Sequence, residues 1–203
     1  MLNDITVFNI REYLSDKDDK ILGEEMLQQI LSEFSCEKNS DVEKFLKGKS
    51  IEFTKKNQSV TYLVFSNEDA ALVGYFTLTI KPIVVKADSF SNTMKRKIAR
   101  VSELDVTHGT YTLSAYLIAQ LGKNYSEGLS ERITGKQLLQ AAIDTIKELQ
   151  YMAGGMVIFL EAEDNEKLME FYEGQNGFRK FATKDTKNEA EDSHVLIQLL
   201  KVM

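Results

Sequence analysis

The feature that most constrains the fold is a long amphipathic helix that runs into two glycines and a short apolar segment. Its apolar face carries Leu138, Leu139, Ala142, Ile143, Ile146 and Leu149, and its polar face carries Lys136, Gln140, Asp144 and Lys147. Gly154 and Gly155 end the helix, and Met156 to Glu161 has the composition of a buried strand. Because Tyr111 to Leu121 is also strand-like, the order strand, helix, strand predicts a right-handed crossover and a local parallel pair.

The rest of the chain alternates between the helical and the strand period. Apolar residues at helical spacing predict two N-terminal helices, one containing Met26 and Ile30 and one containing Val42 and Leu46. Runs of β-branched and aromatic residues predict an antiparallel pair at residues 60–65 and 71–84 and a final hairpin at residues 178–183 and 194–200. Residues 166–173 are expected to form a short helix. We therefore expect an α/β (α+β) fold with a mixed, mostly antiparallel sheet flanked by helices.

Composition limits the setting in which the chain works. The 203 residues are 43% apolar and contain a single proline, with no linker or repeat, so we expect one domain spanning residues 1–203. Cys36 is the only cysteine, and no leader or membrane-spanning run is evident, which favours a cytoplasmic protein with no membrane contact. The net charge of −6 disfavours a nucleic-acid binder held by phosphates, although four positive charges gather between Met94 and Arg100, in a loop or short helix.

A candidate anion site precedes the long helix. The loop Ser130-Glu131-Arg132-Ile133-Thr134-Gly135 runs directly into its first turn. A helix N-terminus presents free N–H donors, and a glycine there allows close approach, so this place suits a phosphate. Arg132 and Lys136 add two positive charges. In the alternative interpretation, Gly135 only relieves packing.

A second candidate region follows the apolar strand. Phe159 to Phe178 contains an acidic strand end, then Asn165, a short helix, Tyr172 and a Gly-Phe corner. Aromatic residues such as Tyr172 are also common in protein cores. A strand that leads to a phosphate site, beside a parallel strand followed by Asn and Tyr, leaves a gap that suits a nucleotide-bearing ligand.

At this point the sequence resembles the GNAT N-acetyltransferases, which use acetyl-CoA. Three stretches carry the resemblance, and together they span residues 111–183: Leu121-Gly122-Lys123-Asn124, Gly135-Lys136-Gln137-Leu138-Leu139, and Asn165-x-x-Leu168-x-x-Phe171-Tyr172-Glu173-x-x-Asn176-Gly177-Phe178. The first matches the end of the family's fourth strand, the second its pyrophosphate loop, and the third its Asn and Phe-Tyr motif. The third stretch is the most specific, although it is one residue longer than usual.

The resemblance implies a role for each matching residue. Backbone groups of Leu121, Gly122 and Lys123 would hold the pantetheine arm and the thioester, at a splayed central strand pair. Backbone amides of the loop would bind the pyrophosphate, from Arg132, Ile133, Thr134, Gly135 and Lys136. Asn165 would contact the pantetheine, and Tyr172 would be the general acid that protonates the departing thiolate. The cosubstrate would be acetyl-CoA.

The sequence departs from the family pattern at three positions. Ser130 stands where the loop usually has Arg or Gln, Ile133 where it has Gly, and Lys123 where an apolar residue is usual. Arg132 is the candidate to replace the missing charge. These departures leave open a non-catalytic GNAT-like binding module.

The N-terminal half is similar to the GNAT branch that includes toxins acetylating aminoacyl-tRNA. The similarity rests on Phe34-Ser35-Cys36-Glu37, Val42-x-x-Phe45-Leu46, Tyr62-Leu63-Val64-Phe65 and Val73-Gly74-Tyr75-Phe76-Thr77-Leu78. Such enzymes need a positive surface for tRNA, which here only Lys95, Arg96, Lys97 and Arg100 offer.

We expect direct acetyl transfer from acetyl-CoA to a primary amine in a ternary complex. A small-molecule or peptide amine is the expected acceptor, with aminoacyl-tRNA as the alternative and a monomer or homodimer as the assembly. Glu161 and Glu163 are the carboxylates available as a base or as a surface for a cationic substrate. His108 and His194 lack the partners of a metal site, and Cys36 is expected to be a buried thiol.

Overall fold

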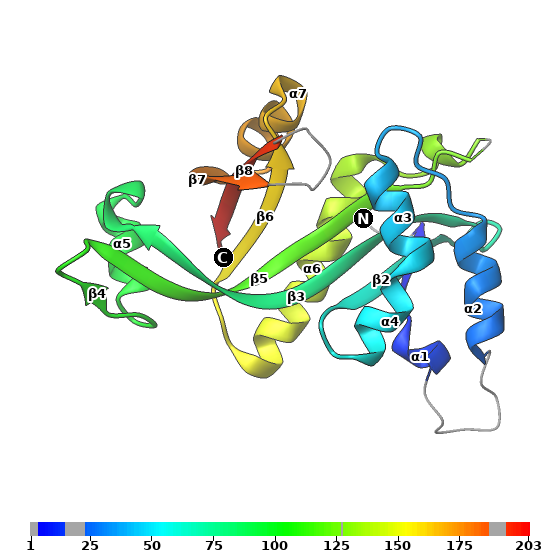
Figure 1. Cartoon of the computed structure of the whole chain (residues 1–203), viewed down its shortest axis with the longest axis horizontal. Helices are drawn as coiled ribbons and strands as arrows, with labels where there is room; N and C mark the ends of the chain where they lie inside the picture. Colours follow the sequence, from blue (N-terminus) through cyan, green and yellow to red (C-terminus); the bar gives the residue numbers. More distant parts are fainter. Residues whose placement is uncertain (1–3, 15–22, 127, 187–193) are drawn as a thin grey trace. The chain divides into compact units, whose positions relative to one another are not determined.

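The computed structural model describes residues 4–14, 23–126, 128–186 and 194–203 (Figure 1). The chain forms two compact units, Met1–Thr79 with Ile118–Glu148 and Ile80–Leu117 with Leu149–Met203. The boundaries between them fall inside three continuous elements, β3 (Leu72–Lys86), β5 (Thr110–Lys123) and α6 (Gly135–Ala153). Each unit therefore combines two segments that are separated along the chain.

Unit 1 contains four N-terminal helices and the strand order β1-β2-β3-β5. Its further elements are β1 (Ile5–Asn9), α1 (Arg11–Leu14), α2 (Gly23–Ser32), α3 (Ser40–Gly48), α4 (Ser50–Lys55), β2 (Val60–Ser66) and the 3-10 turn η2 (Leu129–Glu131). The β2–β3 pair is antiparallel, which confirms the prediction, and β1 pairs antiparallel with β2. β1, α1 and α4 were not predicted, because segments of four to six residues carry too few periods to be recognised.

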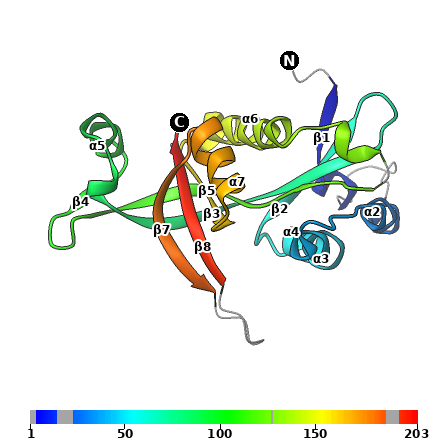
Figure 2. The same ribbon diagram turned by 90° about the horizontal axis from the view of Figure 1, so that it is seen from above.

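Helices cover both faces of the strands of unit 1 (Figure 2). A Cβ placed on Gly74 of β3 would lie 3.1 Å from Leu138 Cδ1 of α6. A Cβ placed on Gly122 of β5 would lie 2.4 Å from Val42 Cγ1 of α3. At Gly122 a side chain would overlap helix α3, and at Gly74 it would meet the Gly122 carbonyl oxygen at 2.9 Å as well as α6, so glycine suits both positions.

Unit 2 contains the distal halves of β3 and β5 and a second group of strands. Its further elements are the 3-10 turn η1 (Ala87–Ser89), α5 (Asn92–Ile98), β4 (Leu104–Asp105), β6 (Val157–Glu163), α7 (Glu166–Met169), the π-helical turn η3 (Glu170–Gln175), β7 (Arg179–Thr186) and β8 (His194–Val202). The strand order is β5-β6-β8-β7, so β8 lies between β6 and β7 and pairs antiparallel with both. The C-terminal hairpin is therefore confirmed.

The fold class is also confirmed: helices flank a sheet in which the pairs β1–β2, β2–β3, β4–β5, β6–β8 and β7–β8 are antiparallel. α6 begins at Gly135 and ends at Ala153, just before the two glycines, as the sequence predicts. Three residues of the basic segment, Lys95, Arg96 and Lys97, lie in helix α5, which the buried Ile98 anchors, and Arg100 follows the helix. In the described part of the chain, no helix is long and apolar enough to cross a membrane.

Candidate cofactor and acid-base residues

The N-terminus of α6 is closed by a reciprocal pair of side-chain hydrogen bonds. Thr134 Oγ1 accepts from the Gln137 amide at 3.1 Å, and Gln137 Oε1 accepts from the Thr134 amide at 2.9 Å. This is a capping box with glutamine at the third position, which satisfies two of the amides that a helix leaves unpaired. The arrangement leaves the amides of Gly135 and Lys136, in the first turn, as the donors for an anion.

The loop before α6 is anchored at two places in unit 1. Ile133 is 1% exposed, so its side chain fills the core where the GNAT pattern has glycine. The Arg132 guanidinium donates to Asp69 Oδ2 in the β2–β3 turn and lies 3.9 Å from Glu68 Oε2. Arg132 is thus neutralised by nearby carboxylates, and it is not a free charge that replaces the missing loop residue. The Arg132 amide itself donates to the Leu129 carbonyl at 3.2 Å.

The end of β5 is packed on one side and half-exposed on the other. Gly122 faces the Val42, Tyr75 and Phe34 side chains, so its lack of a Cβ serves the core. Leu121 and Lys123 alternate with it and are half-buried. Burial, and then the charge of Lys38, lower the pKa of the Lys123 ammonium group. We therefore still assign any contact of Leu121, Gly122 and Lys123 with the pantetheine arm to their backbone N–H and C=O groups.

Tyr172 sits in the π-helical turn of unit 2 among other aromatic rings. Its ring centroid lies 4.9 Å from that of Phe171 and 5.8 Å from that of Phe178, both edge-on. Burial raises the pKa of the Tyr172 phenol to about 12. A phenol with this pKa is fully protonated at neutral pH, which a general acid requires. The predicted helix over residues 166–173 is α-helical only as far as Met169 and then widens into the π form, a form frequent at functional sites.

Asn165 starts α7 as its N-cap. Its Oδ1 accepts from the Lys167 amide at 2.9 Å and from the Leu168 amide at 3.4 Å. The first position of the Asn and Phe-Tyr motif thus has a local structural task, whatever else its amide nitrogen contacts.

The remaining candidates have defined partners. Glu161 Oε2 is 2.9 Å from Lys184 Nζ, and its Oε1 accepts from Gln198 at 2.7 Å, whereas Glu163 is exposed.

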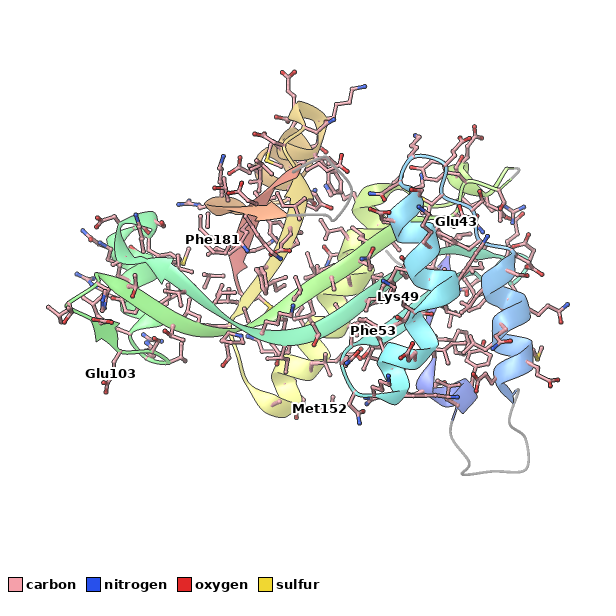
Figure 3. All side chains as sticks on the ribbon, in the orientation of Figure 1. Glu43, Lys49, Phe53, Glu103, Met152 and Phe181 are labelled. Atoms are coloured by element: carbon pink, nitrogen blue, oxygen red, sulfur yellow. The ribbon has the colours of Figure 1, made fainter. Side chains whose placement is uncertain are left out.

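Cys36 is buried, as predicted, and burial raises the pKa of its thiol. Its amide donates to Oε2 of Glu43, which Figure 3 labels on α3. His108 contacts Asp105 at 2.7 Å, and no group of metal ligands occurs among the described residues.

The predicted residues divide between the two units. Unit 1 holds the end of β5 and the loop that leads into α6, and unit 2 holds Asn165 and Tyr172. Sequence reasoning included Gln137 in the stretch that resembles the pyrophosphate loop but missed its capping role, which the Thr-x-x-Gln spacing could have revealed. It also missed Asp69 and Tyr125, which no local pattern marks because their partners lie far away along the chain.

Comparisons with known proteins come from solved structures. No protein-family model matches the sequence, and no curated protein matches it. A structure of AtaT complexed with acetyl-methionyl-tRNAfMet is 18% identical with a TM-score of 0.61, covering 96% of this chain and 94% of that one. A variant of KacT is also 18% identical, with a TM-score of 0.60 and the same coverage of both chains. A structure described as a bacterial toxin is 12% identical with a TM-score of 0.56, covering 95% of this chain and 89% of that one. Over nearly its whole length, the chain therefore has the GNAT-like fold of these toxin structures.

Proposed function

We propose that this protein is an acetyl-CoA-dependent N-acetyltransferase whose acceptor is the amino group of an aminoacyl-tRNA. The observation that carries the proposal is the fold similarity to AtaT over 96% of the chain, since that protein was solved with acetyl-methionyl-tRNAfMet. AtaT has also been solved with acetyl-CoA, in a structure 19% identical to this chain with a TM-score of 0.53. The three GNAT-like stretches of the sequence support the same chemistry.

The start of α6 fits the cosubstrate's pyrophosphate. Gly135 and Lys136 contribute first-turn amides, and the positive end of the helix dipole adds to the exposed Lys136 ammonium. The Thr134 amide is already bound by Gln137, and the Arg132 amide by Leu129, so fewer donors serve this role than the resemblance implies. Backbone groups of Leu121, Gly122 and Lys123 would hold the pantetheine arm, with Asn165 as a further contact.

Tyr172 would supply the proton that completes the reaction. When bound, acetyl-CoA provides the reactive thioester. A neutral acceptor amine would attack the carbonyl carbon, and the carbon–sulfur bond would break. The Tyr172 hydroxyl would protonate the departing sulfur, and the proton lost by the amine nitrogen would return through solvent to the Tyr172 phenolate. Burial raises the pKa of this phenol to about 12, so the hydroxyl carries its proton at neutral pH. Glu161 is held by Lys184 and Gln198, which makes it a poor candidate for the base that deprotonates the amine.

A cationic small-molecule or peptide amine is the second candidate acceptor. The net charge of −6 favours it, because an acidic protein attracts cations and repels RNA phosphates. Both acceptors use the same acetyl-CoA chemistry, so one assay can compare them.

The first test is a calorimetric titration with acetyl-CoA. We expect micromolar binding that is lost in Gly135→Trp, because an indole at the first turn blocks the amides. Gly48→Trp is the matched control, since a Cβ at Gly48 meets nothing within 4 Å. Absence of binding at millimolar acetyl-CoA would overturn the enzyme and leave a GNAT-like binding module.

The second test is transfer of labelled acetyl from acetyl-CoA. The substrates are aminoacyl-tRNA, the matching free amino acids and simple polyamines. Label in the aminoacyl-tRNA alone is the expected result. Label in the free amines alone would establish the second candidate.

A further inference from the structure

Two lysines from different segments of unit 1 share one aromatic ring. Lys38 Nζ lies 4.6 Å from the ring centroid of Tyr125, and Lys123 Nζ lies 5.8 Å from it. Lys38 belongs to the loop between α2 and α3, and Lys123 is the last residue of β5. Cation–π attraction holds each ammonium group at the ring.

The buried Asn124 fixes this arrangement. Its side chain accepts from the Ser35 amide at 3.0 Å and donates to the Leu72 carbonyl at 2.8 Å. The Tyr125 amide in turn donates to the Ser35 carbonyl at 2.7 Å. The loop that carries Lys38 is thereby joined to the end of β5, which brings together the segments that carry the three side chains.

The positive charges of this cluster are not balanced locally. Among the described residues, no carboxylate lies within 4 Å of the ammonium group of Lys38 or Lys123. By contrast, five other lysines of unit 1 each pair with an Asp or a Glu: Lys44, Lys47, Lys55, Lys56 and Lys147. Like charges held together by the fold are unfavourable unless an anion joins them. In a chain of net charge −6, such a pair is a specific local feature and not part of a general basic surface.

We propose that Lys38, Lys123 and Tyr125 form a phosphate-binding subsite that receives a phosphodiester of the RNA acceptor. This inference rests on the proposed function. Lys123 is the last of the three residues whose backbone groups are expected at the pantetheine and the thioester, so an anion held by its side chain would lie beside the proposed transfer site. In an aminoacyl-tRNA, the phosphodiester nearest to the amine is only one nucleotide away. The cosubstrate's phosphates have their own donors at Gly135 and Lys136.

Binding of deacylated tRNA tests the subsite. In fluorescence anisotropy across a salt series, we expect Lys38→Gln with Lys123→Gln to weaken binding about tenfold. The slope of log K against log salt should fall by roughly 0.7 to 1.8, because up to two phosphate contacts are lost. Lys38→Arg should retain binding, and so should Lys44→Gln, a control on α3 with a 76% exposed side chain.

Acetyl-CoA and 3′-dephospho-CoA distinguish the two sources of phosphate. We expect Lys38→Gln, which lies outside the residues assigned to the cosubstrate, to bind both cofactors within twofold of the parent protein. A double variant with unchanged tRNA affinity and slope would overturn the subsite, while acetylation by the parent protein would keep the proposed function standing. If Lys38→Gln instead loses the preference for CoA over the dephospho form, the subsite belongs to the cosubstrate. A parent protein that binds acetyl-CoA but no tRNA would overturn both the subsite and the RNA acceptor.

Discussion

At the scale of single residues, chemistry here is set by what surrounds a side chain. Tyr172 is an ordinary phenol whose pKa rises to about 12 because burial among Phe171 and Phe178 disfavours the phenolate. Arg132, by contrast, has lost its availability to a ligand because Asp69 pairs with it. The surroundings of each side chain thus decide whether it can donate a proton or bind an anion.

Replacing Tyr172 with phenylalanine should lower kcat about 100-fold or more with little change in KM, because only proton donation to the leaving group is lost. Steady-state release of free thiol measures this effect. Tyr151→Phe is the matched control, since Tyr151 is 93% exposed on α6. Equal loss of activity in both variants would contradict the role of Tyr172.

The raised pKa of Tyr172 also predicts a change of stability with pH. Its folded pKa of about 12 exceeds the ordinary value of 10.0 for a tyrosine phenol. The contribution of the protonated phenol to the free energy of unfolding is therefore fully present below pH 10 and is lost as pH rises toward 12. Above pH 10 the unfolded chain gains stability by ionising this phenol first. Urea unfolding at pH 9 and 11 should therefore show a smaller loss for Tyr172→Phe than for the parent protein, and parallel losses would contradict the shift.

At the scale of elements, close packing decides which residues the strands can carry. β5 passes so near α3 that Gly122 has no room for a methyl group, and its carbonyl oxygen also lies 2.9 Å from a Cβ built on Gly74. A motif glycine that suggests ligand contact in the sequence is thus explained by helix-to-strand packing. The capping box at Thr134 and Gln137 is likewise a structural feature within a stretch that suggests ligand binding. It starts α6, and it uses the Thr134 amide, which the resemblance assigns to the pyrophosphate.

Gly122→Ala should destabilise the protein by roughly 1–3 kcal/mol, because the added methyl overlaps Val42 Cγ1 at 2.4 Å. Chemical denaturation measures the change. Gly48→Ala should not destabilise, since nothing lies near its Cβ. Adding Val42→Ala should restore part of the lost stability, and a double variant that is simply additive would argue against this contact.

At the scale of the whole molecule, charge governs the encounter with RNA. A net charge of −6 repels phosphates at long range, so RNA binding must depend on local basic groups. One such group consists of Arg96 and Lys97 on α5 and Arg100 just after it, all of them exposed. The Lys38 and Lys123 pair is another.

Replacing Lys97 and Arg100 together with glutamine should weaken tRNA binding and reduce the salt slope by up to about 1.8, because each lost phosphate contact removes roughly 0.9. Filter binding over a salt series measures both quantities. Acetyl-CoA affinity should stay unchanged, as should tRNA affinity in Lys147→Gln, an exposed control paired with Asp144. An unaltered slope would exclude α5 from the RNA surface.

Long periodic segments could be predicted, and short or distant features could not. α6 and the antiparallel β2–β3 pair were predicted because their apolar residues repeat over several turns or pairs. The π-helical turn around Tyr172 was not, because its hydrogen-bond spacing leaves no distinct mark on the residue pattern. The positions of the candidate site residues followed from motifs, whereas the partners of those residues did not.

The sequence by itself determined the alternation of helices and strands, the start and end of α6, the burial of Cys36 and the resemblance to acetyl-CoA-dependent enzymes. These features depend on local spacing, which is fully present along the chain. Only the tertiary structure decided that Arg132 is neutralised by Asp69, that Gly122 serves packing against Val42, and that Lys38 and Lys123 meet at Tyr125. Arg132 with Asp69, Gly122 with Val42, and Lys38 with Tyr125 all join residues far apart along the chain, so the energies of these contacts exist only once the chain has folded.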